Sequence, residues 1–368
     1  MAASKAEASR ADRSAQGREH GTDSASADAG EYSLSNSILE QERSTPVLDR
    51  VDVVVAGAGP AGFSAAVAAA RAGAKTLLVE RYGFLGGQFT ATLVSDIPVY
   101  CLLGGEDSGD PKPLFGGIPQ EFIKRLVEVK GINIEAIRRT QKAKAWVLTD
   151  PEMVKAVTQD MVEKAGAGLL LHAMSVAAVV EDGAVKGIIT ESKSGRYAIL
   201  ADLVVDATGD GDVAAASGAA YGKAAVGEML PMSLCSRMAN VDAEKAAAFL
   251  SDRRRLKDLI REGIESGELP KPSAERDLPD IGAAEVDIGV YDYSIDRSNW
   301  TRRGEANIWG PHIAGDGTNV KDLTRAELHT RKELRAYLRF LQKHMPGFED
   351  AYLSHTATQI GVRESRRI

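Results

Sequence analysis

The stretch Val51-Asp-Val-Val-Val-Ala-Gly57-Ala-Gly59-Pro-Ala-Gly62 decides the fold of this 368-residue chain. Its first six residues form a β-branched run that is typical of a buried parallel strand. After the glycines, residues 61–72 read as an alanine-rich helix, which Gly73 ends. A further apolar run at residues 75–80 predicts a second buried strand. Together these segments form one β–α–β unit of about 30 residues, which is the usual size.

The glycines fit the G-x-G-x-x-G pattern, which is meaningful only between a strand and a helix. Gly57 permits a sharp turn, Gly59 lets the backbone approach a pyrophosphate, and Gly62 lets the helix pack closely on the sheet. The helix N-terminus then presents free N–H groups to the phosphates. Glu80 ends the second strand, where a carboxylate accepts hydrogen bonds from ribose hydroxyls. These features predict a dinucleotide site, and the alternative is a glycine turn in a generic α/β domain.

The pattern loosens after residue 90 and becomes regular again near residue 150. A helix is predicted at residues 120–129, and Asp150-Pro151-Glu152 opens another, which ends at Gly166. Residues 202–206 form a buried strand that leads into Ala207-Thr208-Gly209. Between them we expect a β-meander, with strands near residues 169–172, 175–181, 185–191 and 197–200.

Beyond residue 220 the sequence predicts a charged helical stretch at residues 242–267 and a later long helix. The later helix is expected to start at Thr324-Arg-Ala-Glu327, which has the form of a capping box. Its apolar stripe is interpreted as a core-facing side rather than as a partner-binding surface. The residues of that stripe are Leu334, Leu338 and Leu341.

Composition excludes several classes of protein. The formal net charge of −7 argues against a nucleic-acid binder, which usually has a basic surplus. No apolar run approaches the roughly 20 residues that cross a bilayer, so we expect no membrane partner. Cys101 and Cys235 are too few for an ordinary iron–sulfur cluster, and two buried cysteines are favoured over a redox pair. We expect a cytoplasmic protein that has no metal site and begins with a disordered tail at residues 1–48.

The glycine motif alone does not separate FAD from NAD, but further segments carry a resemblance. A glycine pair follows the acid in Phe84-Leu-Gly86-Gly87-Gln88-Phe-Thr90, and an apolar strand ends in Leu203-Val-Val-Asp-Ala-Thr-Gly209 and continues Asp210-Gly-Asp212. With Pro346-Gly-Phe-Glu349 and Gly361-Val-Arg-Glu-Ser-Arg-Arg-Ile368, these segments resemble the FAD-dependent oxidoreductases of the glutathione-reductase superfamily. Within that group the chain most resembles relatives of the flavoprotein subunit of heterodisulfide reductase. The resemblance covers about residues 50–368.

The resemblance implies FAD as the cofactor and a Rossmann-type FAD/NAD(P)-binding α/β domain with an inserted β-meander, beside a mixed α+β substrate domain. The FAD domain is expected at residues 49–90 and 150–222, the substrate domain at residues 91–149 and 223–345, and a return segment at residues 346–368. A valine at the start of the meander reads the adenine edge through its backbone in the superfamily, and here it is Val176. The expected cofactor-binding residues are Gly57, Ala58, Gly59, Pro60, Ala61, Gly62, Glu80, Arg81, Gly86, Gly87, Gln88, Thr90, Val176, Ala207, Thr208 and Gly209.

Family members continue past the Gly361–Ile368 segment into a strand and a helix that cover the flavin. We therefore expect this chain to be a fragment or a weak FAD binder. The heterodisulfide reductase subunits also bind iron–sulfur clusters through cysteine motifs, which this sequence lacks.

The implied activity is flavin-mediated hydride or electron transfer on a small organic substrate. The alternative is a subunit that passes electrons to a protein partner and has no substrate of its own. Gln88 and Thr90 are candidates to lie near the flavin, or else to stabilise a local turn. His312 is a candidate proton donor, with a structural role as the alternative. Arg363 and Arg366 are candidates to hold an anionic substrate or the flavin pyrimidine, and the favoured alternative is ion pairing with Glu364.

Overall fold

The computed structural model describes residues 38, 40–94, 96–98, 116–132, 146–250, 253–270, 287–289 and 304–368. The expectations for Cys101 and for the tail up to residue 37 lie outside these residues. The helices and strands below belong to the compact unit Thr45–Ile368. None of the helices in the described ranges is long and apolar enough to cross a membrane.

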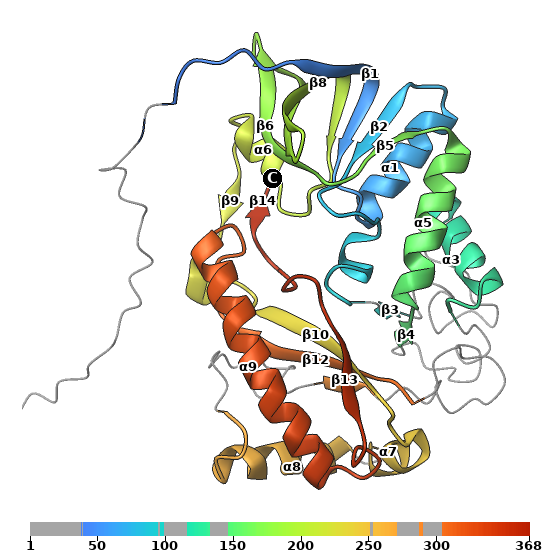
Figure 1. Cartoon of the computed structure of the whole chain (residues 1–368), viewed down its shortest axis with the longest axis vertical. Helices are drawn as coiled ribbons and strands as arrows, with labels where there is room; N and C mark the ends of the chain where they lie inside the picture. The colour runs from blue at the N-terminus through green and yellow to red at the C-terminus, as the bar shows by residue number, and fades with distance from the viewer. Residues whose placement is uncertain are drawn as a thin grey trace, which may run out of the picture. The chain divides into compact units, whose positions relative to one another are not determined.

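A six-stranded sheet with the order β5-β2-β1-β8-β7-β6 carries the predicted glycine motifs (Figure 1). Strand β1 pairs in parallel with β8, so that Val53 lies opposite Leu203 and Ala56 opposite Asp206. This register confirms that residues 51–56 and 202–206 share a sheet. The strands are β1 (Val47–Ala56), β2 (Thr76–Val79), β5 (Gly168–Leu170), β6 (Ala173–Glu181), β7 (Ala184–Ser192) and β8 (Gly195–Asp206).

Three details of this sheet correct the sequence expectations. Strand β1 begins at Val47, four residues before the predicted start, because residues 47–50 continue the pairing with β8. The two strands expected at residues 197–200 and 202–206 are one strand of 12 residues, since no turn residue separates them. Residues 168–170 are not part of the meander: they follow a helix and pair in parallel with β2, as a third crossover strand does.

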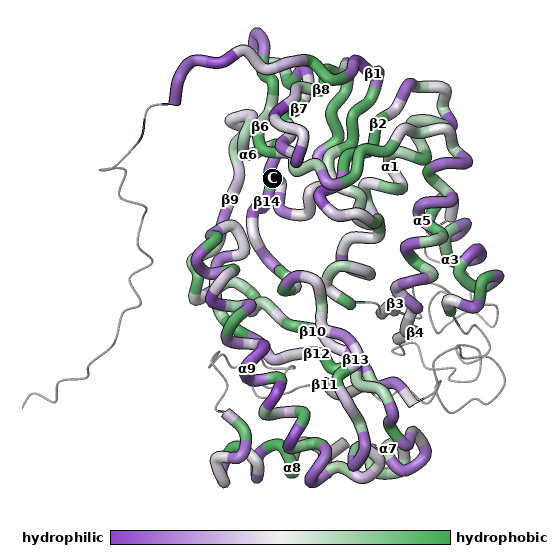
Figure 2. Tube along the Cα trace, viewed as in Figure 1, coloured by the Kyte–Doolittle hydropathy of each residue, from purple (hydrophilic) through white to green (hydrophobic). Residues whose placement is uncertain are grey.

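The core lies on both faces of the sheet. Val53 and Val55 point to one face, where they pack with Phe63 and Phe122 from the helices. Val54 and Ala56 alternate to the other face and pack with Ile188 and Ile199 of the meander strands. Figure 2 shows β1 and β2 as largely apolar, which suits strands covered on both sides. The covering helices are α1 (Pro60–Arg71), α3 (Gly117–Glu128) and α5 (Pro151–Ala165).

The predicted ends of α5 are confirmed. The Asp150 side chain caps the helix by accepting from the backbone N–H groups of Glu152 and Met153, and Gly166 ends it in the left-handed conformation. Short elements complete this part of the chain: η1 (Gly87–Phe89), β3 (Asp96–Pro98), β4 (Trp146–Leu148), α6 (Asp212–Ala216), β9 (Gly222–Lys223), η2 (Val226–Glu228) and β14 (Arg366–Arg367).

A second, antiparallel sheet has the order β11-β12-β10-β13. Helix α9 contacts β10 and β12, and Tyr337, Phe340 and Leu341 of the helix pack with Met238 and Ile308 of the sheet. The predicted helical stretch at residues 242–267 is two helices. The elements are β10 (Met232–Ala239), α7 (Ala243–Leu250), α8 (Arg253–Glu265), β11 (Asp287–Gly289), β12 (Ala306–Ile313), α9 (Val320–His344) and β13 (Tyr352–Thr356).

Helix α9 starts four residues before the predicted capping box. Asn319 is the N-cap, and its side chain accepts from the Lys321 N–H at 2.9 Å. Thr324 is inside the helix and donates to the Val320 carbonyl, so the capping-box prediction is wrong. The apolar stripe is confirmed, because Leu334 and Leu341 are buried and Leu338 packs against the core.

Candidate cofactor site

The glycine turn after β1 contains three glycines of the motif. At two of them the fold leaves no room for a side chain, and at the third it does. Gly57 has a φ of +94°, and a Cβ placed there would lie 2.4 Å from the Ala207 carbonyl oxygen. A Cβ on Gly62 would lie 1.7 Å from the Gly57 oxygen, so this residue permits close packing of helix on turn. Gly59 differs, because its backbone is extended and the nearest atom to a Cβ is the Gly87 Cα at 3.8 Å. A methyl group at Gly59 would therefore clash with no described residue, which leaves the bare Cα open to a ligand.

The N-terminus of α1 lies at the Gly59 Cα. Gly59 is the N-cap and makes no side-chain capping bond, and Pro60 occupies the first turn. The first N–H groups of a helix have no partner within the helix and need a side chain, water or a ligand. These groups also carry the positive end of the helix dipole. The arrangement suits an anion such as a pyrophosphate.

Glu80 is fixed at the end of β2 next to the turn. Its side chain is buried, and its two carboxylate oxygens accept from the Ala58 N–H at 2.8 Å and the Tyr82 N–H at 2.9 Å. Each oxygen keeps a further lone pair that a ribose hydroxyl could use. The carboxylate thus also holds the backbone of the turn, a role that its position in the sequence did not predict.

The Gly86–Gly87 pair lies directly against the first glycine motif. The Gly86 N–H donates to the Ala58 carbonyl at 2.9 Å. A Cβ on Gly87 would lie 2.6 Å from the Gly59 Cα, so a side chain there would collide with the turn. The backbone after the pair continues as η1. The structure therefore brings two glycine segments, separated by a helix and a strand in the sequence, into contact.

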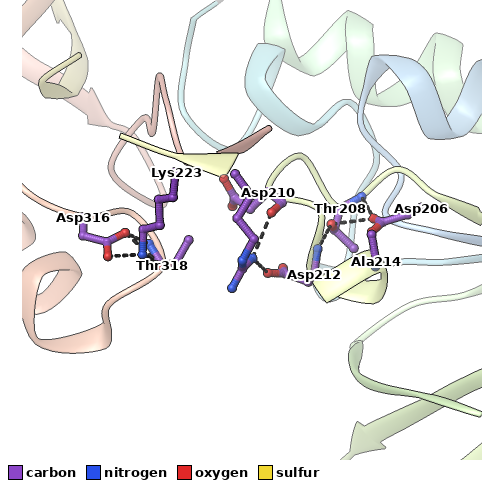
Figure 3. Close-up of polar contacts among 9 residues, drawn as sticks. Asp206, Thr208, Asp210, Asp212, Ala214, Lys223, Asp316 and Thr318 are labelled. Carbon is purple, nitrogen blue, oxygen red and sulfur yellow. Dashed lines mark hydrogen bonds and ion pairs between the residues drawn. The ribbon is translucent and has the colours of Figure 1, made fainter. Parts of the chain in front are cut away.

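The Ala207-Thr208-Gly209 segment is the third segment at this site and lies against Gly57. Asp206 holds it in place: one carboxylate oxygen accepts from the Thr208 N–H and hydroxyl, and the other from the Ala214 N–H at 2.8 Å (Figure 3). The Thr208 hydroxyl also accepts from the Asp212 N–H at 2.9 Å. Sequence reasoning missed Asp206 as a residue that positions this turn, although an acid directly before Ala-Thr-Gly was the available signal.

The other expected cofactor residues divide by what they contact. Thr90 is buried and donates to the Leu85 carbonyl at 2.9 Å, which is the turn-stabilising alternative. Gln88 is exposed, and its carbonyl accepts from the Thr92 hydroxyl. Arg81 is exposed and donates, together with the Tyr82 hydroxyl, to the Gln359 side-chain oxygen. The structure thus places Gln88 and Arg81 at the surface of the site.

Val176 lies at a β-bulge in β6. The pairing with β7 passes from Ser175–Thr190 to Ala177–Ile189, so the ladder skips Val176. The start of β6 is hydrogen-bonded to the backbone of Glu80: the Ala173 N–H donates to the Glu80 carbonyl at 3.0 Å. A bulge leaves backbone groups outside the ladder. The position therefore suits the expected adenine contact through the backbone.

The C-terminal segment runs from β13 to β14 and contacts the second sheet and two loops beside the first sheet (Figure 1). The Thr358 N–H donates to the Ala91 carbonyl, and Gly361 exchanges two backbone hydrogen bonds with Ser233. Arg366 then donates to the Asp210 carbonyl at 2.9 Å and to the Asp212 carboxylate at 2.7 Å.

Asp210 lies at the end of this contact. Burial raises the pKa of its carboxyl group, and a hydrogen bond with Ser365 opposes that shift. Lys223 of β9 forms a separate ion pair with Asp316, as Figure 3 shows.

Of the catalytic candidates, His312 lies on β12 of the second sheet and Arg363 in the segment between β13 and β14. The His312 ring Nδ1 lies 2.7 Å from the Ser233 hydroxyl. Arg363 does not pair with Glu364, which instead binds Arg367, so that alternative is wrong. The Arg363 guanidinium lies over the Trp309 ring, 5.4 Å from its centroid.

Cys235 is fully buried, as expected for a structural cysteine. Among the described residues we find no group of three or more histidine, cysteine or acidic side chains that could hold a metal.

Residues 52–368 match the family model described as FAD dependent oxidoreductase. The fumarate reductase (cytochrome) of Shewanella frigidimarina is 27% identical over 191 residues, covering 44% of this chain and 33% of the relative. The tRNA uridine 5-carboxymethylaminomethyl modification enzyme MnmG of Geobacillus thermodenitrificans is 30% identical over 154 residues, covering 40% of this chain and 22% of the relative. A geranylgeranyl bacteriochlorophyll reductase-like structure from Thermoplasma acidophilum is 16% identical with a TM-score of 0.47, covering 86% of this chain and 66% of that one. The matched segments therefore span a third or less of these two curated relatives.

Proposed function

Since the chain belongs to the FAD dependent oxidoreductase family, we propose that its three glycine-bearing segments hold FAD and that it transfers a hydride or electrons to or from a small organic substrate. The finer resemblance, to relatives of the flavoprotein subunit of heterodisulfide reductase, is part of this proposal. It rests on the segments at residues 84–90 and 203–212.

One observation carries the proposal: the three glycine-bearing segments contact one another in the structure. A Cβ on Gly57 would collide with Ala207, and one on Gly87 would collide with Gly59. Glu80 holds the Ala58 N–H. Each of these contacts joins two segments that are far apart in the sequence, and a side chain at Gly59 would clash with none of the described residues. Such a cradle fits the extended pyrophosphate and ribose of a dinucleotide.

The chain's own residues have distinct tasks in this proposal. The α1 N-terminus at Gly59 binds the pyrophosphate, and Glu80 binds the adenosine ribose. The turn at Thr208, fixed by Asp206, approaches the remainder of the cofactor through its backbone. The bound flavin supplies the redox chemistry, and the protein orients it and excludes competing reactions.

The second sheet supports an enzyme rather than an electron relay. Ser233 and His312 form a hydrogen-bonded pair that can hold or move a proton. Trp309 of the same sheet lies against the Arg363 guanidinium, which comes from the segment between β13 and β14. A relay surface would be expected to be flat and apolar instead.

The test is the visible absorption spectrum of the purified protein, followed by anaerobic addition of candidate reductants. We expect flavin bands at one FAD per chain and bleaching by at least one small organic compound. Gly227→Ala, which adds a methyl group that contacts nothing within 4 Å, is the matched control and should bind FAD normally. A protein without flavin bands after addition of FAD would contradict the cofactor assignment. Reduction only by a protein donor would favour the relay.

A further inference from the structure

Arg363 has an unusual environment for a charged side chain. It is about half-buried, and burial lowers the pKa of its guanidinium, which nevertheless stays protonated. Among the described residues, its side chain contacts the face of the Trp309 ring, 5.4 Å from the centroid, and Glu364 next to it pairs with Arg367 instead. A charge withdrawn from water without a counter-charge is unfavourable, so a group at this position usually has a partner.

The neighbours of Arg363 lie on β10 and β12 of the second sheet. Trp309 lies beneath the guanidinium and pairs across the ladder with Cys235. In the same two strands Ser233 pairs with His312. Strand β12 thus carries both the ring that Arg363 contacts and the imidazole of the Ser233–His312 pair.

The segment between β13 and β14, which carries Arg363, also contacts the residues of the proposed cofactor site. Gly361, two residues before Arg363, lies against Thr92: a Cβ on Gly361 would be 3.7 Å from the Thr92 Cβ. Thr92 follows the Gly86–Gly87 loop and donates to the Gln88 carbonyl at 2.9 Å. This segment therefore brings Gly361, two residues before Arg363, against the end of the loop that belongs to the proposed FAD site.

We propose that Arg363, stacked on Trp309 and assisted by the Ser233–His312 pair, binds the carboxylate of a monoanionic organic substrate. This inference rests on the proposed function and names its substrate class. A guanidinium presents two parallel N–H groups that match the two oxygens of a carboxylate, and stacking on the indole fixes its plane. The imidazole and hydroxyl add hydrogen-bonding groups for the same ligand.

The single positive charge of Arg363 favours a carboxylate over a phosphate as the ligand. Arg363 is the one cation of the described cluster, so it neutralises a single negative charge. A phosphate ester carries nearly two charges at neutral pH and would leave one unpaired in a half-buried position. A neutral substrate would leave the guanidinium without its counter-charge.

The experiment uses the FAD-loaded protein and isothermal titration calorimetry with two monocarboxylates, propionate and benzoate. Their neutral amides, propionamide and benzamide, are the matched ligands. We expect at least one carboxylate to bind at least tenfold more tightly than its amide. Arg363→Gln should weaken that binding about 10- to 100-fold and leave the FAD content unchanged. Arg363→Lys, which retains the charge without the planar fork, should lose less.

Arg339→Gln is the control, because Arg339 is an exposed arginine on α9 and should not affect carboxylate binding. Equal affinity of Arg363→Gln and the wild type for the carboxylate would overturn the inference, as would equal binding of acid and amide. Loss of FAD from Arg363→Gln, with carboxylate binding retained, would also overturn it and assign Arg363 to the flavin. A wild-type protein that binds no FAD would refute the proposed function instead, and that result is read separately from the flavin spectrum.

Discussion

Gly59→Ala separates cofactor binding from folding more sharply than any other change in the glycine turn. The Gly59 backbone has a φ of −69° and a ψ of −173°, which alanine adopts without strain. The nearest atom to the new Cβ is the Gly87 Cα at 3.8 Å, an ordinary van der Waals contact. The methyl group should therefore not disturb the fold. It should hinder binding of the pyrophosphate, which is expected to approach the same Cα.

The magnitudes follow from these distances. Alanine at a compatible glycine position restricts the unfolded chain, so the free energy of unfolding of the apoprotein should stay equal or rise by about 0.4–1 kcal/mol. A methyl group in the ligand's space should break at least one charge-assisted hydrogen bond between a backbone N–H and phosphate. Such a bond contributes about 1.5–3 kcal/mol. The Kd for FAD should therefore rise roughly 10- to 150-fold.

Two measurements check this expectation: urea unfolding of the apoprotein, and titration of FAD followed by quenching of flavin fluorescence. Gly62→Ala is the contrasting variant, since its Cβ would lie 1.7 Å from the Gly57 oxygen and should disrupt the turn itself. Gly227→Ala should change neither quantity. If Gly59→Ala bound FAD as tightly as the wild type, the reasoning about the open space would be wrong. A large loss of stability in the apoprotein would refute it equally.

Three further predictions concern local interactions. Glu80→Ala should lower the free energy of unfolding of the apoprotein by about 1–3 kcal/mol, because two backbone N–H groups lose their acceptor, and should weaken FAD binding by a similar amount; unchanged apoprotein stability would contradict the dual role. Asn319→Ala should destabilise by about 1 kcal/mol and Thr324→Ala by less than about 0.5 kcal/mol, and the reverse order in urea unfolding would restore the capping-box prediction. Hydrogen bonds from Arg71, and then Arg125, lower the pKa of Glu121 from 4.5 to about 2. Its stabilising contribution should be complete above pH 4.5 and be lost as the pH falls towards 2, so Glu121→Gln should flatten the acid limb of the pH–stability curve.

The sequence predicted the β–α–β unit because local signals agreed there. The β-branched run, the glycines and the alanine-rich helix each specify their own structure. The Asp150 cap and the Gly166 stop were predicted for the same reason. The close approaches at Gly57, Gly62 and Gly87 could be predicted because glycine is required where chains approach closely.

Features set by distant contacts could not be predicted in this way. The start of α9 depended on Asn319, whose capping bond competes with an equally plausible capping box at Thr324. The parallel pairing of β5 depends on its neighbour β2, and nothing in Leu169–Leu170 distinguishes it from a meander strand. The Trp309–Arg363 stack joins residues 54 positions apart, a separation at which the sequence carries no periodic signal.

The cofactor and substrate sides of the site are coupled by one segment of the chain. Between β13 and β14, Thr358 binds Ala91 of the cofactor loop, and Gly361 binds Ser233 of the second sheet. Arg366 then closes on Asp212, beside the turn that Asp206 holds. A ligand that orders the cofactor loop must therefore also restrict this segment, since the segment's backbone groups are shared between the two sides. FAD binding should then stabilise the position of Arg363, and the affinity for a carboxylate should be higher in the FAD-loaded protein than in the apoprotein. Calorimetric titration of both forms with the same carboxylate measures this difference directly, and equal affinities would show that the segment does not transmit it.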